Sequence, residues 1–172
     1  QYSDYVNAYG PTETTICATA WWAEKDLAGT SVPIGPPIAN KRIYIVNKRF
    51  ALQPIGIAGE MCVGGVGQAR GYLNRPELTA ERFIDISRFN PDIRAEFGQK
   101  NEPVYRTGDL ARWKTDGNVE FLGRIDHQVK IRGFRIELGE IENRLIEHPA
   151  IKVAAVLDRT DKNGEKFLCA YY

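Results

Sequence analysis

The stretch from Gly123 to Glu140 most constrains the fold, because it reads as a junction between a β-rich body and a smaller unit. Apolar side chains occupy positions 129 and 131 and then positions 134, 136 and 138, so the alternation changes parity across Gly133. Such a change at a glycine predicts a hairpin turn or bulge between two short strands. Basic residues at positions 130, 132 and 135 alternate with the apolar ones. By charge pattern alone, that cluster is typical of a solvated strand face.

The chain downstream of this hairpin predicts a small α+β unit. Residues 138–146 carry apolar side chains at the spacing of one helical face, and Pro149 ends the predicted helix. Residues 151–156 and 167–171 read as strands joined by a turn at Asn163-Gly164. The order hairpin, helix, strand, strand describes a unit that we expect to continue beyond this chain.

The chain upstream of the junction predicts mostly strands and turns, so the fold class is α+β. Its glycine-rich stretch at residues 56–71 does not have the spacing of a dinucleotide-binding fingerprint and is typical of turns and bulges in a twisted sheet. The predicted elements are a strand at 42–47, a short helix at 74–83 with Pro76 near its start, a surface loop at 85–103, two strands separated by a turn at Gly108 within 105–113, and a hairpin turn at Asp116-Gly117.

Near the N-terminus, a strand at residues 5–9 is followed by a turn at Gly10-Pro11 and a predicted helix at 13–16 capped by Thr12. A strand, a turn and a helix start in this order commonly hold a phosphate or a divalent cation. A capped surface helix is the alternative. Asp109 leaves a similar choice, because a carboxylate after a glycine turn serves either the turn or a ligand hydroxyl.

Composition excludes several classes of function. A formal net charge of +1 gives no electrostatic reason to expect nucleic acid or an anionic membrane as partner. Three widely spaced cysteines and two histidines argue against a disulfide framework and a zinc site, and favour a reducing compartment, the cytoplasm. No apolar run approaches the length of a membrane span, and no signal-peptide pattern opens the chain.

Five motifs together resemble the adenylation domains of nonribosomal peptide synthetases, within the adenylate-forming enzymes. They occur in the order that the family has and cover nearly the whole chain. The sequence of residues 128–137 resembles the peptide-synthetase form of this motif more than the form found in acyl-CoA synthetases or luciferases. The motifs are Asn7-Ala8-Tyr9-Gly10-Pro11-Thr12-Glu13, Gly59-Glu60-Met61-Cys62-Val63-Gly64-Gly65, Ala69-Arg70-Gly71-Tyr72-Leu73, Tyr105-Arg106-Thr107-Gly108-Asp109-Leu110 and the stretch 123–142.

The resemblance implies a β-rich late part of the large subdomain at residues 1–124, a hinge at 125–126 and an incomplete mobile C-terminal subdomain at 127–172. It also implies that a phosphate loop precedes Gln1 and that a catalytic lysine follows Tyr172. Enzymes of this family activate an amino acid with ATP and Mg²⁺ and pass the acyl group to the phosphopantetheine of a carrier domain.

The resemblance further implies roles for individual residues. Thr12 would contact the α-phosphate, Arg124 would approach the ribose and phosphate, and Glu13 would coordinate magnesium. The nucleotide would be held by Asn7 and Tyr9 at adenine, by Gly10 in the same motif, and by Asp109 and Phe121 at ribose. The hinge would be Asp126, Gly133 would line the pantetheine tunnel in the thioester-forming state, and Ala8, Ile16 and Cys17 would line part of the substrate pocket.

The three pocket residues are small or apolar and are similar to pockets for phenylalanine, so we expect an apolar or aromatic amino acid. The other expected partners are a peptidyl carrier domain and neighbouring synthetase domains. An acyl-CoA synthetase and a non-catalytic nucleotide-binding module are the alternatives. The sequence does not indicate which amino acid is activated.

Overall fold

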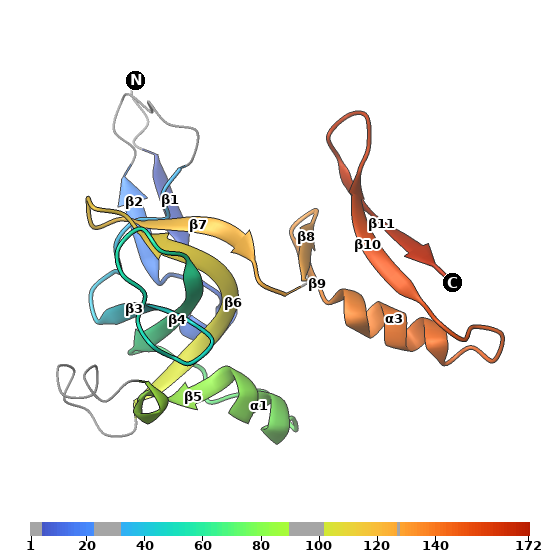
Figure 1. The fold of residues 1–172 in the computed structure, drawn as a ribbon, viewed down its shortest axis with the longest axis horizontal. Coiled ribbons are helices and arrows are strands. Elements are labelled where there is room, and N and C mark those ends of the chain that lie inside the picture. The colour runs from blue at the N-terminus through green and yellow to red at the C-terminus, as the bar shows by residue number, and fades with distance from the viewer. Residues whose placement is uncertain (1–4, 23–31, 90–101, 127) are drawn as a thin grey trace. The chain divides into compact units, whose positions relative to one another are not determined.

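The computed structural model describes residues 5–22, 32–89, 102–126 and 128–172 (Figure 1). Contacts divide the chain into two compact units, Gln1–Ile125 and Asp126–Tyr172. Among the described residues, no helix is both long and apolar enough to cross a membrane.

The first unit is built on a five-stranded antiparallel sheet. Its strands are β3 (Lys41–Val46), β4 (Gly59–Gly65), β5 (Phe83–Asp85), β6 (Pro103–Trp113) and β7 (Val119–Arg124). They run in the order β3-β4-β6-β5, and β7 also pairs with β6. The strand β6 is long and strongly curved, and β4, β5 and β7 all pair with it (Figure 1). Helix α1 (Pro76–Arg82) immediately precedes β5, and Pro76 starts it as predicted.

A separate two-stranded sheet stands at the N-terminal end of this unit. It consists of β1 (Val6–Tyr9) and β2 (Thr19–Trp22), with Tyr9 opposite Thr19. Isolated bridges connect Thr19 to Pro37 and Gly35 to Val119, so the small sheet is tied through residues 35–37 to β7. The sequence pattern did not predict β2.

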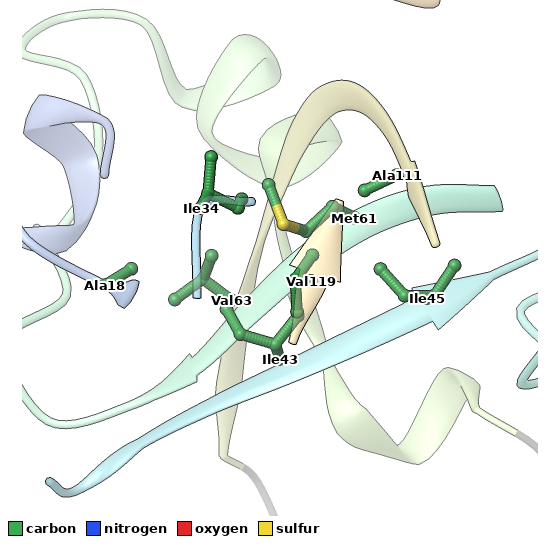
Figure 2. Packing of buried hydrophobic residues seen from close by; sticks show 8 residues of the cluster. All are labelled: Ala18, Ile34, Ile43, Ile45, Met61, Val63, Ala111 and Val119. Atoms are coloured by element: carbon green, nitrogen blue, oxygen red, sulfur yellow. The ribbon is translucent and has the colours of Figure 1, made fainter. Parts of the chain in front are cut away.

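Apolar side chains on both faces of the main sheet are buried. Successive residues of its strands point alternately into two hydrophobic clusters, one on each face. Ile43, Ile45, Met61 and Val63 pack on one face with Ala18, Ile34, Ala111 and Val119, as Figure 2 shows. The intervening residues of β3 and β4 face the other cluster. That second cluster consists of Tyr44, Val46, Cys62, Ile84, Ile86, Phe89 and Val104.

A conservative change on this sheet tests the packing. Ile45 is 1% exposed, so Ile45→Val should lower the free energy of unfolding by about 0.5–1.5 kcal/mol, the loss for one buried methylene. Ile55 is 62% exposed, and the same change there should stay within about 0.5 kcal/mol. Urea unfolding followed by tryptophan fluorescence measures both, since Trp113 packs against the cluster that contains Ile45. Equal effects at the two sites would contradict the assignment of the core.

The second unit begins with the predicted hairpin, β8 (Val129–Ile131) and β9 (Phe134–Ile136). Helix α3 (Leu138–Ile146) follows, with Leu138 buried at its start. The strands β10 (Ala155–Thr160) and β11 (Lys166–Tyr171) then pair antiparallel. Val156 is buried, and its backbone nitrogen donates to Glu142 of α3 at 2.8 Å, which docks the helix on this hairpin.

Four local predictions were wrong. Residues 13–16 do not form a capped helix: a single 3-10 turn spans Thr12–Thr14, and the Thr12 side chain is not its cap. Residues 105–113 form one continuous strand with bulges instead of two strands. The strand predicted at 151–156 is β10, which starts at Ala155.

The fourth error concerns residues 85–103, predicted as a surface loop. In the described part of that range, Asp85 ends β5, and Ile86 and Phe89 are buried in the second cluster. Glu102 is also buried, and it accepts hydrogen bonds from Arg42 at 2.7 Å and from the Gly65 backbone at 2.6 Å. Residues 90–101 lie outside the described part of the chain.

Candidate nucleotide site

Four of the predicted site residues meet where β1 approaches β6 and β7. The Tyr9 hydroxyl donates to the Asp109 carboxylate, and Arg124 donates to the other carboxylate oxygen at 2.9 Å. Arg124 also donates to the Thr107 carbonyl at 3.0 Å. The rings of Tyr9 and Phe121 lie 6.4 Å apart. The structure therefore brings together Tyr9, Asp109, Phe121 and Arg124, which come from three strands.

Bulges in β6 hold Asp109 at this place. The pairing register of β6 shifts against β4 between Met61 and Cys62, and Gly108 has a left-handed φ of 72°. Thr107 locks the distorted segment, because its hydroxyl donates to the Met61 carbonyl at 2.7 Å and accepts from the Asp109 nitrogen at 2.9 Å. Bulges re-aim side chains next to active sites. Here the bulge is combined with a carboxylate that is only 6% exposed.

Glu13, which follows Tyr9 by four positions in the sequence, belongs to a second polar group. Its side chain is 9% exposed, and one oxygen accepts a hydrogen bond from the Tyr72 hydroxyl at 2.7 Å. The Tyr72 hydroxyl also lies 3.4 Å from that of Tyr105. The Glu13 carbonyl accepts from the Ala69 nitrogen at 2.8 Å. Thr12, one residue earlier, is exposed to solvent.

The loop that carries Thr12 and Glu13 has an unusual backbone. Thr15 and Ile16 have φ values of 61° and 64°, the left-handed region that β-branched residues strongly avoid. Lys41 donates to the Thr14 carbonyl at 2.6 Å, and the Thr15 hydroxyl donates to the Gly67 carbonyl. Strained backbone persists only where the surroundings over-determine it, and it clusters at functional sites.

Gly10 is required for the start of this loop. A Cβ atom at Gly10 would lie 2.4 Å from the Ile16 carbonyl oxygen and 2.7 Å from the Ala18 nitrogen. The loop therefore closes directly against β1, where the Ala18 nitrogen donates to the Tyr9 carbonyl at 2.7 Å.

Burial shifts the pKa values of several ionisable groups at the site. Desolvation is the largest cause that raises the pKa of the Tyr9 hydroxyl well above its usual value, and the Asp109 charge is the second. Tyr9 therefore stays a hydrogen-bond donor. Burial also raises the pKa of Tyr72, with further contributions from Tyr105 and Glu13. Desolvation lowers the pKa of the Lys41 ammonium.

The remaining candidates of the N-terminal sheet are more loosely placed. The Asn7 amide nitrogen donates to the Pro33 carbonyl at 2.7 Å. Ala8 is exposed, Ile16 is 77% exposed, and the Cys17 sulfur lies 3.9 Å from the Thr19 carbonyl oxygen. Among the described contacts, none joins the side chains of Ala8, Ile16 and Cys17 to one another. Ala8 lies within β1, and Ile16 and Cys17 lie in the loop between β1 and β2.

The last two candidates lie in the second unit. One carboxylate oxygen of Asp126 accepts from the Gln128 backbone nitrogen at 3.2 Å, an Asx turn at the first residue of the unit. Gly133 has a φ of 83° in the turn between β8 and β9, and a Cβ atom there would meet nothing within 4 Å. The turn therefore needs glycine for its conformation and not for internal packing.

A nucleotide-bound magnesium ion fits this donor set. In the described parts of the chain, no cluster of three or more His, Cys, Asp or Glu side chains is arranged to hold a metal ion. Mg²⁺ in nucleotide sites is usually held by one or two carboxylates together with substrate phosphates and water. The Glu13 carboxylate is a hard oxygen donor of the kind that this mode of binding needs, and it directly follows Thr12 in the sequence.

Sequence reasoning missed three side chains that organise the site. Thr107 and Tyr72 stood within quoted motifs without assigned roles, and Lys41 was not singled out. Of these three, Tyr72 could have been found from the sequence. It directly follows the glycine-rich stretch, and a buried tyrosine hydroxyl usually finds a hydrogen-bond partner.

Comparisons with known proteins found a matching family and similar synthetases. Residues 2–73 match the family described as AMP-binding enzyme. Tyrocidine synthase 1 of Brevibacillus parabrevis is 59% identical over 169 residues, which cover 98% of this chain and 15% of that protein. The chain thus spans a small part of the length of this relative.

Two solved structures extend the comparison. The protein PA1221, an NRPS protein containing adenylation and PCP domains, matches with a TM-score of 0.78 and 34% identity over 96% of this chain and 32% of that chain. AB3403, a four-domain nonribosomal peptide synthetase bound to AMP and glycine, matches with a TM-score of 0.61 and 40% identity over 98% of this chain and 12% of that chain. The chain therefore corresponds to part of an adenylation domain of the nonribosomal peptide synthetase type, and its residues 2–73 match the AMP-binding enzyme family.

Proposed function

We propose that this chain supplies part of the ATP site of an enzyme that activates an amino acid as its adenylate and transfers it to the phosphopantetheine thiol of a carrier domain. The observation that carries the proposal is the cluster of Tyr9, Asp109, Phe121 and Arg124. It combines aromatic rings for a base with a buried carboxylate for ribose. The chain covers only 15% of tyrocidine synthase 1, and this supports the proposal that it acts within a longer synthetase.

In this reaction the substrate carboxylate attacks the α-phosphate of ATP, and pyrophosphate leaves. The ribose hydroxyls would donate to Asp109, which as a carboxylate only accepts hydrogen bonds. Tyr9 and Arg124 already fix that carboxylate from both sides. Tyr9 and Phe121 would pack against the nucleoside, with the Asn7 amide and the Gly10 turn beside them.

The reaction brings an anion to an anion, so charge must be neutralised where it develops. Bound magnesium would supply that neutralisation as a Lewis acid on the phosphates. Glu13 would hold the ion through its carboxylate, and the Thr12 hydroxyl would donate to the α-phosphate. Arg124 would add a fixed cation on the ribose side of the same site.

We further propose that Ala8, Ile16 and Cys17 contribute to an apolar amino-acid pocket that other parts of the synthetase complete. The hinge at 125–126, between parts 1–124 and 127–172, would present the Gly133 turn to the pantetheine arm in the second half-reaction. Three free cysteines fit a reducing cytoplasm.

The test is ATP–pyrophosphate exchange by the synthetase that contains this segment, measured with each of the twenty amino acids. Exchange should depend on one or a few amino acids, with apolar and aromatic ones foremost. AMP formation that instead requires a fatty acid and coenzyme A would establish the acyl-CoA synthetase alternative. Nucleotide binding without either reaction would establish a non-catalytic module.

The Asp109 role predicts a binding defect. Asp109→Asn should raise the KM for ATP roughly tenfold, the loss of a hydrogen bond to a charged group, with kcat nearly unchanged. Contacts made equally in the ground and transition states change KM and leave kcat alone. Steady-state exchange kinetics separate the two constants. Asp116→Asn, in the exposed turn between β6 and β7, is the control and should match the parent. An unchanged KM for Asp109→Asn would exclude it from the ribose site.

A further inference from the structure

Tyr72 contacts Glu13 from a segment that the proposed mechanism does not use. The residue lies between β4 and α1, and its hydroxyl donates to one Glu13 carboxylate oxygen at 2.7 Å. The two residues are 59 positions apart in the chain, so the contact depends on the tertiary fold. It joins the proposed magnesium ligand to a part of the molecule that carries no assigned role.

The backbone around Tyr72 is fixed. Its nitrogen donates to the Thr79 hydroxyl oxygen at 2.9 Å, and that hydroxyl in turn donates to the Arg75 carbonyl at 2.9 Å. Gly71 has a φ of 135°, and a Cβ atom there would lie 2.4 Å from Thr79 Cγ2. The start of α1 therefore holds Tyr72 through Thr79, with glycine at the point of close approach.

The ring of Tyr72 is held as firmly as its backbone. It packs edge-on against Phe83 with the ring centroids 5.8 Å apart, and Phe83 in turn packs against Tyr105 at 5.0 Å. Tyr105 is fully buried in β6, and its hydroxyl lies 3.4 Å from that of Tyr72. Packed aromatic rings thus direct the Tyr72 hydroxyl at the Glu13 carboxylate.

We infer that Tyr72 is a positioning residue that holds the Glu13 carboxylate in its metal-binding orientation. The inference rests on the proposed function, since it needs Glu13 to be the magnesium ligand. Hydrogen bonds from outer groups orient ligating carboxylates, and losing one such partner typically weakens metal affinity by about 10–100-fold. Because Glu13 Oε1 accepts from the Tyr72 hydroxyl, this hydrogen bond would fix the orientation in which the carboxylate meets the metal.

The test compares Tyr72→Phe with the parent synthetase. The variant keeps the ring and its packing on Phe83 and removes only the hydroxyl. The Mg²⁺ concentration that gives the half-maximal exchange rate, at saturating ATP and amino acid, should rise about tenfold. A second readout is independent of turnover: binding of Mn²⁺ in the presence of a non-hydrolysable ATP analogue, followed by electron paramagnetic resonance, should weaken by a similar factor.

Two reference variants make the result decisive. Tyr44→Phe removes another buried tyrosine hydroxyl of the same unit, one that lies in the second hydrophobic cluster, and should leave both readouts at parental values. Glu13→Gln should change both readouts. If Glu13→Gln changes neither, the metal role of Glu13 in the proposed function is wrong. If Glu13→Gln changes both and Tyr72→Phe changes neither, or tightens metal binding, the inference about Tyr72 is overturned and the proposed function stands.

Discussion

Glu13→Gln in the synthetase that contains this segment should lower kcat for adenylate formation by about 10²-fold, the loss typical of one transition-state stabiliser. Glutamine keeps the size of the side chain and an oxygen that can accept from the Tyr72 hydroxyl, so the local structure should persist. It removes the negative charge that holds the metal against the phosphates. The measurement is amino-acid-dependent pyrophosphate exchange at saturating substrates.

Glu102 provides a matched control for this substitution. It is a buried carboxylate of the same unit, 8% exposed, and it is bound by Arg42 and the Gly65 backbone, neither of which has a role in the proposed reaction. Glu102→Gln should lower stability, because it removes the charge of a buried carboxylate that is paired with the partly exposed Arg42. It should leave the magnesium dependence of exchange at the parental value. Parental turnover in Glu13→Gln, or an equal loss of turnover in both variants, would remove Glu13 from the reaction.

Much of the fold could be predicted from the sequence, because local patterns indicate most of the described strands and the helices α1 and α3. Periodicity located β3, the hairpin at Gly133 and helix α3. The errors arose where tertiary contacts override local preference. Thr15 and Ile16 are β-branched residues that would not choose a left-handed φ alone, and hydrogen bonds from Lys41 and to Gly67 hold that turn.

The candidate site divides in the same way. The motif resemblance named Tyr9, Asp109, Phe121 and Arg124, and the structure brings these four residues together. The motif resemblance did not indicate that Tyr9 and Asp109, which are 100 positions apart, share a hydrogen bond. That contact depends on bulges in β6, and strand register at a bulge is set by pairing with neighbouring strands rather than by the local sequence.

The hinge assignment predicts the second large effect. Asp126→Pro should leave adenylate formation largely intact and slow transfer to the carrier thiol on the order of 10²-fold, as expected when a reacting group is misplaced. Proline fixes φ near −65°, so a residue that supplies a dihedral change between two states can no longer supply it. The motivation is local. The first unit ends at Ile125, whose nitrogen donates to the Gly108 carbonyl at 2.8 Å, and the hairpin β8–β9 starts at Val129.

The measurement is single-turnover formation of the aminoacyl adenylate beside loading of the carrier domain, in the intact synthetase. Asp126→Ala is the control: it removes the Asx hydrogen bond to the Gln128 nitrogen but leaves φ free, so its loading rate should stay near that of the parent. Equal losses of both half-reactions in Asp126→Pro would indicate general damage to the fold. Undiminished loading would place the pivot at another residue, because a rotation that needs freedom at Asp126 does not survive a fixed φ there.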